Sequence, residues 1–165
     1  MSDAKKQIAD IIKIGIKTEI EGQKFYSALA QKIANPEARK KIEALATDEV
    51  SHERRLRDLY KEHLGGEPGD LPAEGLAIFK DAFGDAPLDE ADKFRLLELA
   101  IEAERLTARH YKKGEDMCDN PKSRKVFAEL VAEEDGHFNM LMAEREGLRG
   151  NIHWFTYDDS AMLED

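Results

Sequence analysis

Cysteine is nearly absent from the chain, since Cys118 is the only one among 165 residues. A single cysteine excludes a disulfide framework within the chain and any iron or zinc module that needs four cysteines. Long apolar runs are also missing, because none approaches the roughly 18 residues of a membrane span. Lysines interrupt the isoleucines of the opening stretch, MSDAKKQIADIIKIGIK, which therefore lacks a signal-peptide core. We expect a cytoplasmic protein with no membrane association.

Positive charge is in deficit. The chain has 25 Lys and Arg against 35 Asp and Glu, which gives a net charge of -10 at pH 7, and it has no basic run. Nucleic acid and anionic membrane surfaces are therefore poor partners, whereas cations are better ones. The length suits one domain with its own apolar core.

Proline is scarce: two of the five prolines lie at the starts of predicted helices, and the other three lie in the crossover between them. Between the breaks, apolar residues recur at helical spacing, for example at Ile8, Ile12 and Ile16, and strand signals are absent. We predict helices over about residues 3–33, 36–63, 90–118 and 121–148, a crossover over 64–92 with a short helix near 76–83, and a tail over 149–165. Two short turns and one long connection indicate an all-α antiparallel four-helix bundle within residues 1–148.

The two halves of the chain repeat each other. A shift of 85 positions carries Tyr26 onto Tyr111 without a gap, and the same register aligns further pairs. These pairs are Glu19 with Glu104, Asn35-Pro36 with Asn120-Pro121, Leu45 with Leu130, Glu49 with Glu134, His52 with His137 and Leu56 with Leu141. Chance similarity between two amphipathic hairpins would explain the leucines, but it does not predict the shared Asn-Pro, Glu and His. We therefore interpret the bundle as two pseudo-repeated helical hairpins.

Ionisable residues interrupt the apolar stripe of each predicted helix. On the second helix, the inward positions 42, 45, 49, 52, 56 and 59 hold Ile, Leu, Glu, His, Leu and Leu. The fourth helix repeats this pattern with Glu134 and His137, and the spacing of three puts each Glu and His one turn apart on one face. Glu19 and Glu104 lie on the inward stripes of the first and third helices. Each helix thus turns polar groups towards the core.

Four buried carboxylates need a positive counterpart, because unpaired charges in a low-dielectric interior cost many kcal/mol and like charges repel. Two divalent cations balance the four negative charges, and two imidazoles favour a transition metal over Mg²⁺ or Ca²⁺. We predict a two-metal centre whose ligands are Glu19, Glu49, His52, Glu104, Glu134 and His137. Such a centre leaves open positions for dioxygen or peroxide. The alternative is a metal-free bundle in which core histidines form salt bridges with glutamates.

Three stretches resemble helix signatures of the rubrerythrin-type branch of the ferritin-like superfamily. They are residues 19–26 (EIEGQKFY), 48–52 (DEVSH) and 133–137 (EEDGH), and the resemblance covers about residues 5–148. A Glu from two helices with Glu-x-x-His from two others is a known ligand pattern of this superfamily. The resemblance implies a non-haem di-iron site, open to Mn or Zn substitution, that reacts with peroxide or dioxygen. It also implies an oxidative-stress role in prokaryotes and a homodimer.

Two features depart from rubrerythrins in the strict sense. Those proteins carry a rubredoxin domain with four cysteines, which Cys118 alone cannot provide, so we expect electrons from a separate donor such as a rubredoxin-like protein. They also carry an extra Glu where this chain has Thr107. We predict a di-iron oxidoreductase that reduces peroxide or dioxygen. A ferritin-like iron oxidation and storage protein, or a structural bundle with a vestigial metal site, are the alternatives.

Several further residues have two interpretations. Tyr26 and Tyr111, two turns from the glutamates of their helices, either hydrogen-bond or transfer electrons near the centre, or only pack in the core. Asp48 and Glu133 lie four residues before the predicted histidine ligands of their own helices. We expect them to be solvated charges, with orientation of those imidazoles as the alternative. The other histidines, which we expect on the surface, are His63, His110 and His153.

Overall fold

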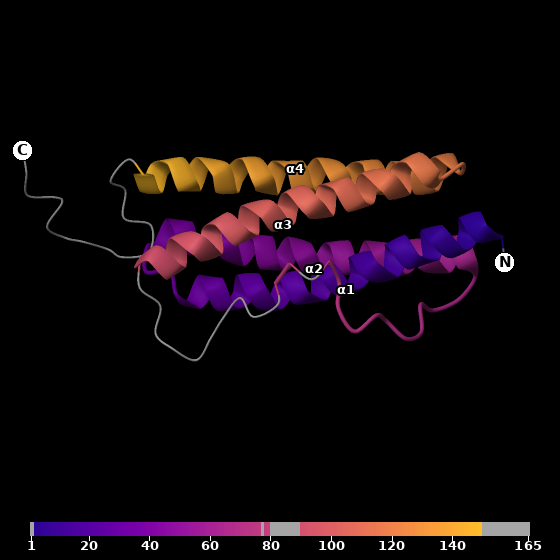
Figure 1. Ribbon diagram of the computed structural model, residues 1–165, viewed down its shortest axis with the longest axis horizontal. Helices are drawn as coiled ribbons and strands as arrows, with labels where there is room; N and C mark the ends of the chain where they lie inside the picture. The colour runs from indigo at the N-terminus through magenta and orange to yellow at the C-terminus, as the bar shows by residue number, and fades with distance from the viewer. Residues whose placement is uncertain (1, 77, 80–89, 150–165) are drawn as a thin grey trace, which may run out of the picture.

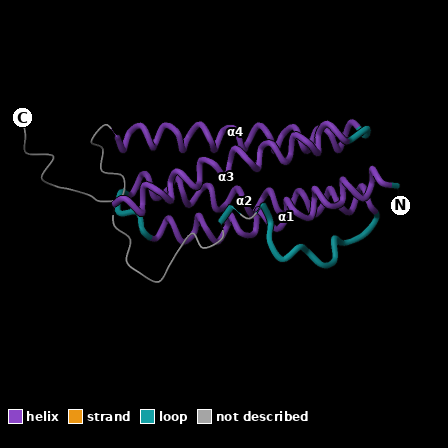
Figure 2. Tube along the Cα trace, viewed as in Figure 1, coloured by secondary structure: helices purple, strands orange, loops and turns teal. Residues whose placement is uncertain are grey.

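Four long helices make up the computed structural model, which describes residues 2–76, 78–79 and 90–149. They are α1 (Asp3–Gln31), α2 (Pro36–Leu64), α3 (Glu90–Met117) and α4 (Pro121–Arg149). Figure 1 shows them running along one long axis, and the closest packing joins α1 with α2 and α3 with α4. Figure 2 shows helices and loops but no strand in the described part of the chain. The architecture is the predicted all-α four-helix bundle with one long crossover. The predicted tail beyond α4 lies outside the described residues.

The repeated Asn-Pro pairs begin the second helix of each hairpin. Asn35 Oδ1 accepts hydrogen bonds from the backbone N–H groups of Glu37 and Ala38, each at 3.0 Å. Asn120 caps α4 in the same way, at 2.8 and 3.3 Å, and the proline that follows suits the first helical position. Gly65 ends α2 with a φ of 80°, a left-handed conformation that glycine adopts without strain. Every helix end lies within two residues of its predicted position.

The crossover contacts α1. The Leu76 N–H donates to Thr18 Oγ1 at 3.0 Å, and the ring of Phe79 lies 4.6 Å from that of Phe25, measured between centroids. The described residues of the short helix predicted near 76–83 are not helical. The other residues of that predicted helix lie outside the described part.

Two apolar clusters fill the bundle, with polar residues between them. The first cluster contains Phe25, Leu29, Ile42, Leu45, Leu97 and Leu141 among others, and the second contains Ile12, Ile16, Leu56, Leu59, Phe127 and Leu130 among others. On α2, the step from one cluster to the other crosses Glu49 and His52, which are both buried. The fold therefore encloses polar groups at mid-height, with apolar packing on either side.

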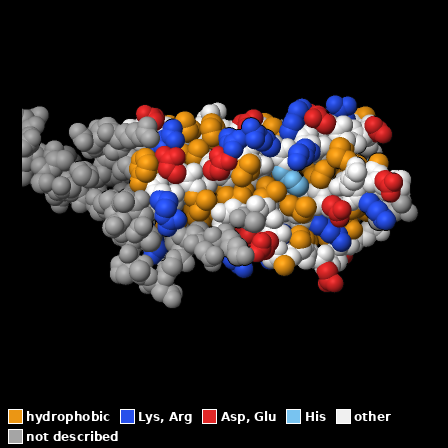
Figure 3. All heavy atoms as spheres, in the orientation of Figure 1, with side chains coloured by type: hydrophobic (Ala, Val, Ile, Leu, Met, Phe, Trp, Pro, Cys, Tyr) orange, Lys and Arg blue, Asp and Glu red, His pale blue; other side chains and the backbone are white. Residues whose placement is uncertain are grey.

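The outer surface has an ordinary mixed character. Figure 3 shows acidic and basic side chains interspersed with apolar ones on the face that it draws. None of the helices in the described ranges combines the length and the apolar character that a bilayer span requires. Among the described residues, the unusual polar side chains are those buried inside the bundle.

Candidate metal centre

The six residues predicted as ligands converge at the middle of the bundle, and we call this group the polar layer. Its members are Glu19 of α1, Glu49 and His52 of α2, Glu104 of α3, and Glu134 and His137 of α4. Every one is buried, with His137 the most exposed at 9%. The structure thus brings together all six residues that the sequence singled out.

The polar layer divides into two overlapping groups of donor atoms. In each group, one donor atom per residue lies within 4.8 Å of all the others. The first group is Glu19, Glu49, His52 and Glu134, and the second is Glu49, Glu104, Glu134 and His137. Glu49 and Glu134 are shared, while each end of the layer adds one Glu and one His. The two imidazole rings are stacked with centroids 5.7 Å apart.

Most donor atoms of the polar layer have no hydrogen-bond partner. They are Glu19 Oε2, Glu49 Oε1, both ring nitrogens of His52, Glu104 Oε2, both carboxylate oxygens of Glu134, and His137 Nδ1. His52 Nδ1 comes within 2.7 Å of Glu134 Oε1, yet the pair lacks hydrogen-bond geometry. Carboxylate oxygens and imidazole nitrogens are the donors that a transition metal takes. The residues present therefore fit a metal centre.

The electrostatics of the polar layer also call for a cation. Burial, together with the surrounding carboxylates, raises the pKa values of Glu49 and Glu134 well above the ordinary range. Burial pushes the pKa of Glu104 upward, but its contacts with Glu134 and His137 outweigh burial and lower that pKa overall. Burial lowers the pKa of His137, but contacts with Glu104 and Asp48 outweigh it and raise the pKa to about 9. In the metal-free protein, protons on the Glu49 and Glu134 carboxyls and a charged His137 imidazole therefore offset the negative charge that a bound cation would otherwise balance.

The two tyrosines bond across the bundle to the outer glutamates. Tyr26 of α1 donates its hydroxyl proton to Glu104 Oε1 at 2.5 Å, and Tyr111 of α3 donates to Glu19 Oε1. The repeat relates these two bonds to each other. Burial and the nearby carboxylates raise both tyrosine pKa values well above the ordinary range, so both hydroxyls remain protonated donors. Of the sequence-based interpretations, hydrogen bonding beside the polar layer is the one that the structure shows.

Asp48 and Glu133 are exposed, as expected of solvated charges, but each also lies beside an imidazole of the polar layer. Asp48 Oδ2 lies 2.9 Å from His137 Nε2 in a hydrogen bond between α2 and α4. Glu133 Oε1 lies 3.6 Å from His52 Nε2. Each carboxylate therefore faces the histidine of the opposite helix, not the one on its own helix. The reason is that each imidazole turns inward to the carboxylates, which leaves its outer nitrogen towards the neighbouring helix.

The expectation that His110 lies on the surface is also wrong. His110 is 8% exposed, and its Nε2 lies 2.8 Å from the backbone oxygen of Ile11 on α1. Burial lowers its pKa against the opposing effect of that hydrogen bond. Its burial comes from the packing of α3 against α1, which no local sequence pattern specifies. His63 is half-buried, and the last histidine, at position 153, lies outside the described residues.

Two residues of small or modest size shape the space beside the polar layer. A Cβ added to Gly22 would lie 2.8 Å from Glu49 Oε2. Any larger residue at this position would therefore force the Glu49 carboxylate to move. Gly22 lies within the motif at residues 19–26, but its close approach to Glu49 cannot be predicted from the sequence. Thr107, the repeat equivalent of Gly22, is buried and donates its hydroxyl to the Ala103 carbonyl at 2.8 Å. The position where strict rubrerythrins have an extra glutamate therefore offers no carboxylate here.

A four-helix bundle with an inward Glu on two helices and Glu-x-x-His on the other two belongs to the ferritin-like class. The rubrerythrin family model matches residues 10–145, and the chain therefore belongs to the rubrerythrin family. No protein of curated function matches the chain significantly.

Solved structures share the fold over most of the chain. A hypothetical protein from Pyrococcus furiosus has 28% sequence identity and a TM-score of 0.77, with 91% of this chain and 93% of that chain covered. A ferritin-like, diiron-carboxylate protein from Bacillus anthracis has 19% identity and a TM-score of 0.68, with coverages of 88% and 99%. A dodecameric thioferritin from Bacteroides fragilis, described as bacterioferritin-related, has 15% identity and a TM-score of 0.69, with coverages of 97% and 92%.

Proposed function

We propose that the chain binds two iron ions at the polar layer and reduces peroxide or dioxygen with electrons from a separate donor, such as a rubredoxin-like protein. The observation that carries this proposal is the set of buried carboxylate and imidazole atoms without hydrogen-bond partners. Leaving such groups unpaired costs about 1–3 kcal/mol each, and more for charged ones, which a purely structural bundle would not retain. The diiron-carboxylate protein from Bacillus anthracis, which shares the fold, supports iron over other metals.

The division of the polar layer suggests a role for each residue. Glu49 and Glu134 belong to both ligand groups, so they would bridge the two ions. The Glu and His at each end of the layer would complete one ion each. Four carboxylates then balance two divalent ions. Bound iron would supply electrons and open coordination positions for peroxide or dioxygen.

The residues around the layer would hold these ligands in orientation. Asp48 would accept a hydrogen bond from the Nε2–H of His137. In the neutral imidazole, this would leave the Nδ1 lone pair facing Glu104 Oε2 at 3.6 Å. Tyr26 and Tyr111 each fix one oxygen of an outer glutamate and leave its other oxygen free of protein partners. The site is thus built to present lone pairs inward.

A matched pair of variants tests the ligand assignment and the reaction together. Glu104 is 2% exposed within the layer, whereas Glu102 pairs with Arg105 at the surface. Iron-loaded wild-type protein and Glu102→Ala should consume peroxide continuously when a reduced rubredoxin is added, while Glu104→Ala should lose this turnover. Loss in the Glu102 variant with retention in the Glu104 variant would refute the assignment. Turnover of the wild type without any donor would indicate a catalase-like reaction instead.

Iron oxidation and storage is the second candidate function. The observation in its favour is the fold shared with the dodecameric thioferritin from Bacteroides fragilis. Storage needs a closed shell of many subunits, whereas we propose a homodimer with an oxidative-stress role. Light scattering of the iron-loaded protein separates the two, because a mass near that of a dimer argues against storage and a mass of many subunits argues for it.

A further inference from the structure

The repeat relates the two ends of the polar layer, but the protein does not enclose them equally. On the His52 side, Arg55 Nη1 contacts Glu133 Oε2 at 2.6 Å and Arg55 Nη2 contacts Glu129 Oε2 at 3.4 Å. Arg55 thereby fixes Glu133, whose Oε1 lies 3.6 Å from His52 Nε2. The His52 side chain is completely buried. A paired Arg and Glu therefore cover this imidazole.

The His137 side lacks this cover. The repeat equivalent of Arg55 is Met140, which packs against the first apolar cluster and carries no charge. Asp48, the equivalent of Glu133, has a side chain that is 52% exposed, and the His137 side chain that it contacts is 11% exposed. No arginine holds Asp48 among the described residues. Solvent therefore comes closer to His137 than to His52.

The outer face of the α1–α2 hairpin is also more covered than the outer face of the α3–α4 hairpin. Between α1 and α2, Gln23 Nε2 donates to Glu53 Oε1 at 2.9 Å and to the Glu49 backbone oxygen at 3.4 Å. This side chain lies across the hairpin next to the polar layer and closes that face.

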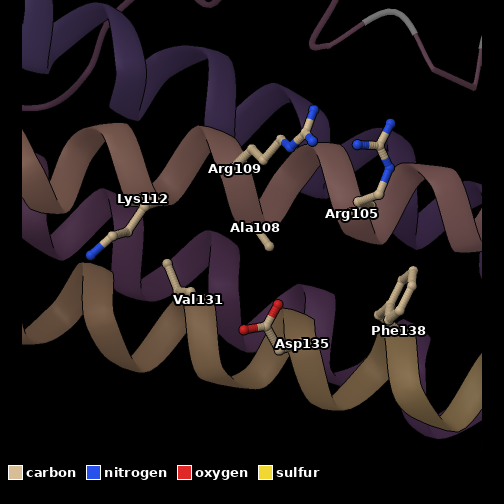
Figure 4. A pocket seen from close by; sticks show the side chains of 7 residues that line it. All are labelled: Arg105, Ala108, Arg109, Lys112, Val131, Asp135 and Phe138. Carbon is tan, nitrogen blue, oxygen red and sulfur yellow. The ribbon is translucent and has the colours of Figure 1, made fainter.

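Between α3 and α4, the equivalent of Gln23 is Ala108, and a groove of about 260 Å³ lies open there. Figure 4 shows Ala108 of α3 pointing towards α4, opposite Val131 and Asp135. Ala108 follows Glu104 by one helical turn, and the groove lies between α3 and α4, the two helices that contribute Glu104 and His137. This face has an opening where the other hairpin has a side chain.

We propose that the centre has one exchangeable and one retained metal position. The end formed by Glu104 and His137 exchanges its ion and takes up small ligands from solvent, while the end formed by Glu19 and His52 is closed by Arg55 and Gln23. This inference rests on the proposed two-metal function. Arg55 and Gln23 are positioning residues, since neither belongs to the polar layer.

The test uses zinc as a redox-silent probe and follows its transfer from the loaded protein to an excess of an anionic chromophoric chelator. Wild-type protein should release two zinc ions per chain in two phases of equal amplitude. Arg55→Met and Gln23→Ala should accelerate the slow phase about tenfold, the lower end of the effect expected when a group that supports a metal ligand is lost. Met140→Arg and Ala108→Gln should instead slow the fast phase.

Lys41→Met is the matched control for Arg55→Met. Lys41 also links α2 to α4, through Glu144, but it covers neither imidazole, so both phases should stay unchanged. A single phase for two bound zinc ions, or acceleration of only the fast phase by Arg55→Met, would overturn the inference and leave the two-metal function standing. Failure to bind zinc at all would instead contradict the proposed function. Should Arg55→Met not fold, the Met140→Arg and Ala108→Gln variants decide the question from the other end.

Discussion

The stability of the metal-free protein should fall as the pH rises from 5 to 8. In the folded protein, the pKa values of Glu49 and Glu134 lie well above their ordinary value of 4.5. Between the ordinary and the raised values, the folded state binds protons that the unfolded state has released. The free energy of unfolding then decreases with increasing pH. The physical cause is that burial and mutual repulsion make the charged carboxylates costly when no metal is present.

Of the other shifted groups, His110 opposes this trend: its pKa is lowered by burial, so it adds stability as the pH rises towards 6.5. It is one group against the two raised carboxyls. The pKa of His137 is raised to about 9 from an ordinary 6.5, so its contribution is full below pH 6.5 and is lost as the pH approaches 9. The pKa of Glu104 is lowered, so it changes stability only as the pH falls below about 4.5. Each extra proton held by the folded state contributes a slope of roughly 1.4 kcal/mol per pH unit. The two raised carboxyls together give at most about 3 kcal/mol per pH unit, or roughly 6–12 °C in Tm for a chain of this size.

Circular dichroism melts of chelator-treated and metal-loaded protein at several pH values measure this effect. The Tm of the metal-free protein should fall with rising pH, and its gap to the loaded protein should widen, because metal binding needs deprotonated ligands. Glu49→Gln removes one of the two carboxyls. The unfolding free energy of the metal-free variant should therefore fall less steeply with pH, by roughly 1.4 kcal/mol per pH unit, which corresponds to one proton. A Tm of the metal-free wild type that is constant or rises from pH 5 to 8 would refute the reasoning.

Two further predictions concern the packing around the polar layer. Gly22→Ala places a methyl group 2.8 Å from Glu49 Oε2 and should weaken metal binding about tenfold or more in a chelator competition. Gly136→Ala is the control, because the space around Gly136 is open. It should leave metal binding unchanged and raise the unfolding free energy by about 0.5–1 kcal/mol. Tyr111→Phe removes the hydroxyl that donates to Glu19 and should lower the unfolding free energy by about 1–3 kcal/mol in denaturant titrations; no loss would show that this bond is unimportant.

Much of the fold could be predicted from the sequence because its signals are local. Asn35 and Asn120 cap helices with their own side chains, and Gly65 ends one through its own backbone conformation. The convergence of the polar layer was also predictable, since helical spacing and the repeat place its six residues at one height. Their role as metal ligands stays a prediction.

The remaining features depend on how the helices dock, which no local pattern specifies. Asp48 faces the histidine of α4 rather than that of its own helix, and this choice follows from the placement of α2 beside α4. The burial of His110 against the Ile11 carbonyl depends in the same way on the contact between α3 and α1. The role of Gly22 follows from the distance between α1 and the Glu49 carboxylate.

Metal stoichiometry tests the central claim most directly. The protein is titrated anaerobically with Fe(II), freed of unbound metal, and analysed for iron per chain. Two overlapping donor groups that share Glu49 and Glu134 predict two irons per chain. A reproducible value below one iron per chain would contradict the account.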